Sequence, residues 1–189
     1  MHKHLIVIVG SLLVSLITAS PATAATIIGG SNLLSQADAD QLQSWLGEGN
    51  IAITNIFSHA PGDGKTSVNF HAAADGQGRT FSIIEVLAGN FYELTANGDS
   101  YVTISRQVIG GYNPQSWASV GGYNVTPLDA ARTAFLFNLT NDLQQEQNLS
   151  GQGLAGSGQY QTVNAMSAGP TFGAGYDLVV YDNFATGSA

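Results

Sequence analysis

Hydrophobic residues along the chain follow two spacings, one helical and one extended, and the change between them divides the part after residue 24. Leu42, Trp45 and Leu46 fall on one face of a helix that Ser35 caps and Gly47 ends. Beyond residue 50, apolar residues form short runs, many alternating with polar residues, between turns rich in Gly, Asn and Pro. The pattern predicts a short amphipathic helix followed by a series of strands.

The extended part of the chain is expected to form short strands joined by turns. Predicted strands occupy residues 51–57, 68–72, 80–87, 101–109, 135–139, 160–166 and 176–181. A turn at 75–78 would join two of them as a hairpin, another turn is predicted at 97–99, and residues 143–160 and 169–175 are predicted to be loops. The resulting fold class is mostly β: an antiparallel β-sandwich with one or two short flanking helices.

Residues 109–141 form the most distinctive stretch, predicted to be a strand, a tight aromatic loop and a second strand. Gly110 and Gly111 allow either a sharp turn or the close approach of a neighbour. Three large amphipathic side chains follow, Tyr112, Trp117 and Tyr123. Such side chains either cover a core or contact a partner. These three are therefore the candidate binding residues, with both interpretations open.

The first 24 residues have the features of a secretory signal peptide. A basic start at residues 1–4 precedes a continuous apolar stretch and a small-residue cleavage site, Ala22-Thr23-Ala24. Retention as a membrane anchor is the alternative. We expect cleavage after Ala24, which leaves residues 25–189 as a single domain with no transmembrane helix. The expected location is secreted, periplasmic or at the cell surface.

Composition argues against several classes of function. With five Lys and Arg against 13 Asp and Glu, a formal net charge of −8, the chain lacks the clustered cations that bind nucleic acid or anionic membranes. The absence of cysteine excludes disulfides, thiol nucleophiles and thiolate metal ligands together. No cofactor is expected, and the expected partner is a protein or a polysaccharide.

Residues suited to catalysis or metal binding are few. His59 and His71 are the only histidines after residue 24 and lack the spacing of a zinc site; His71 is expected to be exposed on a strand. The serine hydrolase motif G-x-S-x-G and the EF-hand pattern are absent. Glu85 interrupts an apolar strand and shares a face with Phe81 and Ile83. It is therefore the carboxylate expected to be partly buried. We assign no catalytic or metal site.

Four segments, in this order, resemble the TLDc domain family. They are the amphipathic helix with Trp45, residues 70–84 with the sequence FHAAADGQGRTFSII, residues 109–117 with IGGYNPQSW followed by AFLFNL at 134–139, and residues 172–178 with FGAGYDL. The resemblance covers residues 33–184 and implies a β-sandwich with short flanking helices. Two departures are an insertion at 126–131 and an end at residue 189, where relatives usually continue into a further strand. The chain is therefore expected to be truncated or to lack one strand.

Eukaryotic relatives in that family are linked to oxidative-stress resistance and to the vacuolar proton pump, cytoplasmic roles that we do not transfer to an exported chain. The sequence favours a non-enzymatic binding or structural module. A secreted hydrolase of cell-wall or matrix polysaccharide, with Glu85 as its candidate carboxylate, is the alternative. Protection against oxidants is a third hypothesis, weakened by the absence of cysteine and the presence of only two methionines.

Overall fold

A computed structural model describes residues 23–95, 98–152 and 157–189 of the chain. Most of the predicted signal peptide, residues 1–22, lies outside this range, as does part of the turn predicted at 97–99. The first half contains β1 (Thr26–Ile28), α1 (Gln36–Leu46), β2 (Ala52–Thr54), α2 (Ser67–Ala74), β3 (Thr80–Thr95) and β4 (Gly98–Asn113). The second half contains β5 (Tyr123–Val125), η1 (Asp129–Ala131), β6 (Phe135–Asn138), β7 (Leu143–Glu146), η2 (Ser157–Gln159), β8 (Tyr160–Val163), β9 (Ala168–Phe172), β10 (Leu178–Tyr181) and β11 (Gly187–Ser188).

The strands form three sheets. β1 and β2 are a parallel pair, a four-stranded antiparallel sheet has the order β3-β4-β6-β7, and a five-stranded sheet has the order β11-β10-β9-β8-β5. Side chains of α1 and the parallel pair pack on one face of the four-stranded sheet, while α2 and the five-stranded sheet pack on the other. The predicted mostly-β sandwich with short flanking helices is confirmed.

The helix α1 begins and ends where the sequence predicts. The Ser35 hydroxyl accepts a hydrogen bond from the Asp38 backbone N–H at 3.2 Å, and the Asp38 carboxylate accepts one from the Ser35 N–H at 2.9 Å. This reciprocal cap satisfies two donors that a helix start leaves unpaired. Gly47 ends the helix in the left-handed conformation, with φ 65°. The Trp45 ring lies 6.2 Å from that of Phe137 and so covers the sheet.

Two glycines inside β4 set how closely the layers approach. A Cβ at Gly110 would meet the Phe137 ring at 2.5 Å, and one at Gly111, on the opposite face, would meet the Phe172 ring at 2.6 Å. Contacts that short require the neighbouring ring to move, and rings in packed layers have little space to do so. The predicted close approach is therefore confirmed at both glycines, whereas a sharp turn does not occur because β4 continues to Asn113.

A second aromatic cluster lies between the four-stranded and five-stranded sheets, around Trp117. Its indole is 1% exposed, and its ring centroid lies 5.5 Å from those of Phe70 and Phe172. The indole N–H donates to the Thr80 hydroxyl at 2.8 Å, and the Trp117 carbonyl accepts from the Gly76 N–H at 3.2 Å. The DGQG and IGGYNPQSW segments therefore meet in one buried contact.

The strand predicted at 68–72, and with it the hairpin through 75–78, is wrong because residues 67–74 form α2. Alternating Val68, Phe70 and Ala72 resembled a strand, but Val68 is 56% exposed and Phe70 is buried. Thr66 donates its N–H to the Asn69 side chain at 2.9 Å, as at a capped helix start. That pair and the run of alanines that follows are the helix signals in the sequence.

Two predicted loops contain strands. β7 lies within 143–160 and pairs with β6, while β9 occupies most of 169–175 and pairs with β8 and β10. Their polar or Gly-Pro-containing sequences gave no strand signal, because strand formation there depends on partners from distant parts of the chain. At the end of the chain β11 pairs with Val179 and Val180 and adds a short strand to the five-stranded sheet.

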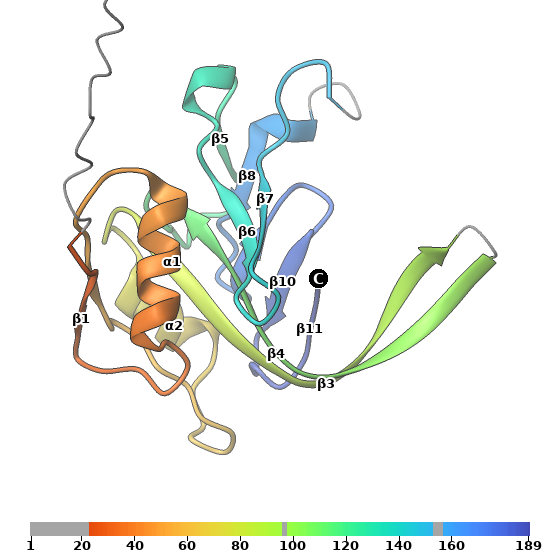
Figure 1. Cartoon of the computed structure of the whole chain (residues 1–189), viewed down its shortest axis with the longest axis horizontal. Helices are drawn as coiled ribbons and strands as arrows, with labels where there is room; N and C mark the ends of the chain where they lie inside the picture. The colour runs from red at the N-terminus through yellow and green to blue at the C-terminus, as the bar shows by residue number, and fades with distance from the viewer. Residues whose placement is uncertain (1–22, 96–97, 153–156) are drawn as a thin grey trace, which may run out of the picture.

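The β3–β4 hairpin extends beyond the rest of the molecule (Figure 1). Its strands pair from Thr80–Asn113 at one end to Thr95–Gly98 at the other, whereas β6 pairs only with Ile109–Tyr112. The distal part of the hairpin is therefore a two-stranded arm, which curves away from the sandwich (Figure 1).

Candidate functional site

The three aromatic residues singled out in the sequence lie in three different places. Tyr112 is 3% exposed and packs under α1, whereas Trp117 is 1% exposed and packs between the two large sheets. Tyr123 is 41% exposed on β5, and its ring lies 5.0 Å from that of Tyr160. The structure therefore does not bring them together as one site.

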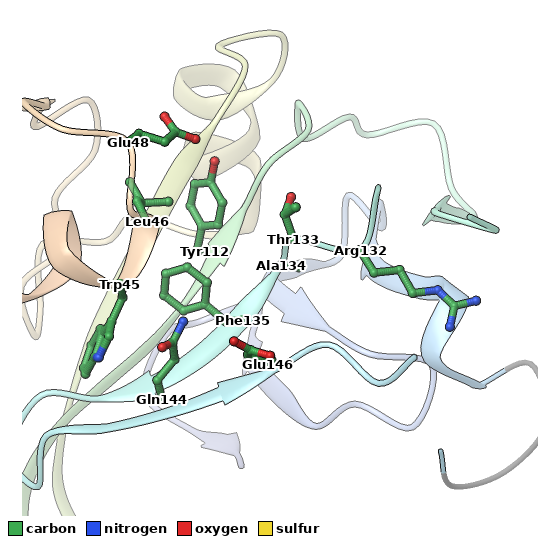
Figure 2. Close-up of a pocket in the computed structure, with 10 residues that line it drawn as sticks. All are labelled: Trp45, Leu46, Glu48, Tyr112, Arg132, Thr133, Ala134, Phe135, Gln144 and Glu146. Carbon is green, nitrogen blue, oxygen red and sulfur yellow. The ribbon is translucent and has the colours of Figure 1, made fainter. Parts of the chain in front are cut away.

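Tyr112 is almost fully buried and lines two neighbouring hollows. Its ring packs between those of Phe81 and Phe135, at 5.1 and 5.2 Å. Figure 2 shows its hydroxyl end directed toward Glu48. Burial raises the pKa of the Tyr112 phenol above its usual 10.0, and the nearby Arg79 cation partly opposes that rise. The phenol is therefore a neutral, largely buried polar group at the edge of a core.

Two hollows meet at Tyr112 and Leu46. The larger, which we call the β2–β3 groove, has a volume of about 440 Å³ and is lined by residues 46, 51–54, 56, 77, 79–81 and 112. The smaller, the Tyr112 hollow, has a volume of about 220 Å³ and is shown in Figure 2. Runs of consecutive residues line the groove on both sides. Since successive side chains of a strand point in opposite directions, such runs mean that strand backbone forms the walls.

One wall of the groove is the free edge of β2. Thr26 donates its N–H to the Ile51 carbonyl, and Asn55 donates to the Ile28 carbonyl, both at 2.9 Å. The backbone groups of alternate residues in β2 therefore face β1, and those of Ala52 and Thr54 face away from it. Within the described residues, β2 has no strand neighbour on that side.

The other wall is the outer edge of β3. Leu139 donates its N–H to the Val108 carbonyl at 2.8 Å, which turns the Val108 backbone toward β6. By alternation Gly111 faces β3, and its partner Ser82 faces β4. The N–H and C=O of Phe81 therefore point outward, and β3 is the last strand of the four-stranded sheet as the structure describes it.

Arg79 carries the only formal charge among the residues that line the groove. Its guanidinium donates to the Glu48 carboxylate at 2.7 Å, and the two side chains are 53% and 46% exposed. The Glu48 carboxylate raises the pKa of Arg79 further above its usual value. A pair this exposed contributes little to stability, roughly 0–1 kcal/mol. It does place a cation at the groove in a chain that is otherwise acidic.

The Tyr112 hollow contains two carboxylates, those of Glu48 and Glu146. In Figure 2 they lie on opposite sides of the Tyr112 and Phe135 rings. The Arg132 guanidinium points away from the other lining side chains in the same view. It pairs with Asp129 at 3.0 Å and donates to the Thr126, Pro127 and Asn148 carbonyls.

The loop that carries Trp117 is held by side-chain amides rather than by charges. The Gln161 amide donates to the Asn113 side-chain oxygen at 2.7 Å in a buried position. Asn124 donates to the Ser116 carbonyl at 3.1 Å, and Asn164 donates to the Asn124 oxygen at 3.0 Å. Side-chain amides do not act as acids or bases, so this network fixes the loop against β5 and β8 without offering a group for proton transfer.

Of the two histidines, only His71 differs from its sequence interpretation. His71 is 4% exposed on α2, so its prediction as an exposed strand residue is wrong. One ring nitrogen lies 2.7 Å from the Asp75 carboxylate, and the other lies 3.0 Å from the Ala165 carbonyl. His59 lies 2.7 Å from Asp63 in the loop before α2. Each histidine has its own carboxylate, and the described part of the chain contains no cluster of three metal-ligating side chains.

Glu85 lies outside both hollows. As predicted, it is half-buried on the face of β3 that carries Phe81 and Ile83, and it forms an ion pair with Arg106 across the hairpin. Every lysine and arginine between residues 23 and 189, gaps aside, is likewise paired with a carboxylate. Backbone N–H donors, that of Lys65 first, hold the pKa of Asp63 well below its usual range.

Apart from Tyr112, the groove residues were not identified from the sequence. Residues 51–57 and 80–87 were recognised as strands, but nothing local shows that both are edge strands that face one another. That fact depends on sheet order. The available signal was the single arginine after the DGQG turn, a cation in a chain that has few.

Among the helices that the structure describes, none has the length and apolar character needed to cross a bilayer. A family model of the TLDc domain matches residues 27–189. Comparisons with curated proteins and with solved structures gave no match.

Proposed function

The chain belongs to the TLDc domain family, and from this premise we propose that it is a non-enzymatic binding module that holds its partner in the β2–β3 groove. The observation that supports the proposal is the chemistry of the groove. Apolar surface comes from Phe81 and from three isoleucines in and beside β2, Ile51, Ile53 and Ile56, and two strand edges supply hydrogen-bonding backbone. The lining includes no carboxylate or imidazole to act as a general base. The groove is therefore suited to holding a ligand rather than converting one.

The proposed place of action is outside the cytoplasm, after removal of residues 1–24. The support is the basic start, apolar stretch and small-residue cleavage site of the sequence. A mature amino terminus at Ala25, read by mass spectrometry of the exported protein, is the expected result. Retention of residues 1–24 in the exported protein would contradict cleavage.

The function is tested by binding and turnover on the same purified protein. We expect no turnover of glycosides, esters or peroxides, and turnover of any of them contradicts a non-enzymatic module. Ala52→Trp places a bulky side chain at an exposed position of the groove wall and is expected to abolish partner binding without lowering the unfolding temperature. Val68→Trp, at an exposed position of α2 that does not line the groove, is the matched control.

A polysaccharide hydrolase is the second candidate, supported by a pair of carboxylates that does not include Glu85, the candidate from the sequence. Glu48 and Glu146 both line the Tyr112 hollow, on opposite sides of its aromatic rings, and glycosidases use a pair of carboxylates across a cleft. Under this alternative, Glu146→Gln eliminates hydrolysis of a polysaccharide and Glu85→Gln does not. Equal hydrolysis by wild type and Glu146→Gln would remove this candidate site.

A further inference from the structure

We propose that the occupant of the β2–β3 groove is an extended polypeptide segment that adds as a strand to the free edges of β2 and β3, with a carboxylate beside Arg79. The proposal rests on the function proposed above for the groove and specifies the chemistry of the partner. It follows from three features of the groove: the backbone groups along its walls, the spacing of its apolar side chains and its single charge.

The backbone groups of the groove match an extended chain. Ala52 and Thr54 on one wall, and Phe81 on the other, direct N–H and C=O groups away from their own sheets. Exposed strand edges are templates for another strand, because the donor and acceptor repeat is the same on both chains. A polysaccharide offers hydroxyl groups, whose chemistry and spacing differ from those of the N–H and C=O groups along a strand. The two edges therefore favour a polypeptide.

The apolar side chains of the groove also match a strand. Ile53 and Phe81 are half-buried at its inner side, and Ile56 is 42% exposed beside them. A bound strand would direct every second side chain toward these residues and the rest toward solvent. The segment is therefore expected to be apolar at alternate positions, with little constraint on the positions between.

The charge of the groove selects a carboxylate. Arg79 is half-exposed, and its guanidinium has five N–H donors in a planar fork, only part of which Glu48 occupies. A carboxylate on the bound segment can share the remaining donors. Glu48 competes for the same cation, so Glu48→Gln is expected to strengthen the binding of an acidic segment.

The probe is a library of random seven-residue peptides displayed on phage, selected against the immobilised protein and eluted under mild conditions. We expect enriched sequences to have apolar residues at alternate positions and an acidic residue or a free carboxyl end. The most enriched peptide is then synthesised, and its affinity is measured by calorimetry. Selection of no peptide, or of peptides without this alternation, overturns the proposal.

Two variants of one residue test the hydrogen bonds to the groove wall. Thr54→Pro removes the N–H that faces the groove, whereas Thr54→Val keeps it and removes only the hydroxyl. Loss of one such bond, with a peptide carbonyl left unpaired, is expected to weaken binding about tenfold in Thr54→Pro and less than about twofold in Thr54→Val. Equal affinity of the two variants contradicts strand addition at β2.

A modified ligand repeats the test without changing the protein. The selected peptide is made with N-methyl groups on alternate amides, in the two possible registers. One register blocks the edge that pairs with β2 and the other blocks the edge that pairs with β3, so each is expected to lose binding about tenfold or more. If neither register changes the affinity, the peptide is not bound as a strand.

The outcomes separate this inference from the proposed function. Binding of a soluble polysaccharide that Ala52→Trp abolishes, with no peptide enriched, preserves the binding module and overturns the peptide. Turnover of a substrate overturns the module whatever the peptides do. Loss of acidic preference in Arg79→Gln, with the unfolding temperature unchanged, supports the assigned role of the arginine.

Discussion

The buried cluster around Trp117, which we call the Trp117 core, and the β2–β3 groove both contain aromatic and apolar side chains. The core is closely packed, whereas the groove is open. In the core, Gly111, Phe172 and Trp117 are packed so closely that one added methyl group meets a ring at 2.6 Å. In the groove, Ile56 and Arg79 are half-exposed, and two strand edges have no neighbour among the described residues. The residues that make this chain recognisable therefore stabilise it, and the surface proposed to bind a partner lies beside them.

Two aromatic residues from one stretch of sequence, Tyr112 and Trp117, have different roles in the molecule. Tyr112 and Trp117 are separated by only a short loop, yet they face different layers of the sandwich. Tyr112 borders the groove and Trp117 does not. Changes at Trp117 should therefore act on stability, whereas changes in the groove wall should act on binding.

The largest expected effect is at Trp117. Trp117→Ala removes a fully buried indole and its hydrogen bond to Thr80, and is expected to lower the free energy of unfolding by about 3–5 kcal/mol. Tyr123→Ala, an exposed aromatic on β5, is the matched control and is expected to change it by less than about 1 kcal/mol. Urea denaturation followed by circular dichroism measures both, and similar losses would contradict the division.

The next effect is at Gly111. Gly111→Ala is expected to cost about 1–3 kcal/mol, because its Cβ meets the Phe172 ring. Adding Phe172→Leu, which shortens that side chain, should recover part of the loss. At Gly175 the nearest atom to an added Cβ is 3.9 Å away, so Gly175→Ala is the control with no expected loss. Thermal denaturation of the wild type, the two single glycine variants and the double variant measures these changes. No recovery in the double variant would contradict the proposed clash.

A smaller effect is expected from the Tyr112 phenol at high pH. Burial raises the pKa of its folded form, so above pH 10.0 the unfolded chain releases the proton first and stability falls until the folded pKa is passed. Below pH 10.0 the phenol is neutral in both states and contributes no pH dependence. Tyr112→Phe is expected to flatten the fall measured by urea denaturation between pH 9 and 11. An unchanged slope would assign the fall to other groups.

The smallest effect on stability is expected at the Arg79–Glu48 pair. Glu48→Gln should change the free energy of unfolding by less than about 1 kcal/mol, because both side chains are half-exposed. Any change should shrink as salt is added, since salt screens exposed charges. A salt-independent loss above that range in thermal denaturation would place the pair in the core rather than at the groove.

The sequence predicts local structure better than it predicts which strands lie at the edges of the sheets. Ser35 and Gly47 mark the ends of α1 because capping is a property of adjacent residues. The fold class and the family resemblance follow from patterns of the same local kind. In contrast, α2 was predicted as a strand because Val68, Phe70 and Ala72 alternate at period two, although in the helix Val68 is exposed and Phe70 is buried.

The candidate site could not be predicted because it is a consequence of sheet order. Whether Thr54 and Phe81 lie at free edges depends on which strands pair, and that depends on contacts far apart in the chain. The burial of His71 has the same origin, since it is enclosed by the carbonyls of residues 165 and 168. The spacing of residues along the sequence shows neither the strand pairing nor the carbonyl groups that surround His71.

Amide hydrogen exchange with and without the selected peptide tests the central claim most directly. The N–H groups of Ala52, Thr54 and Phe81 are expected to exchange rapidly in the free protein and at least about tenfold more slowly in the complex. Those of Ile53 and Ser82, which face neighbouring strands, should be protected in both states. Protection that appears instead along the free edge of β5, or nowhere, would contradict the groove as the binding site.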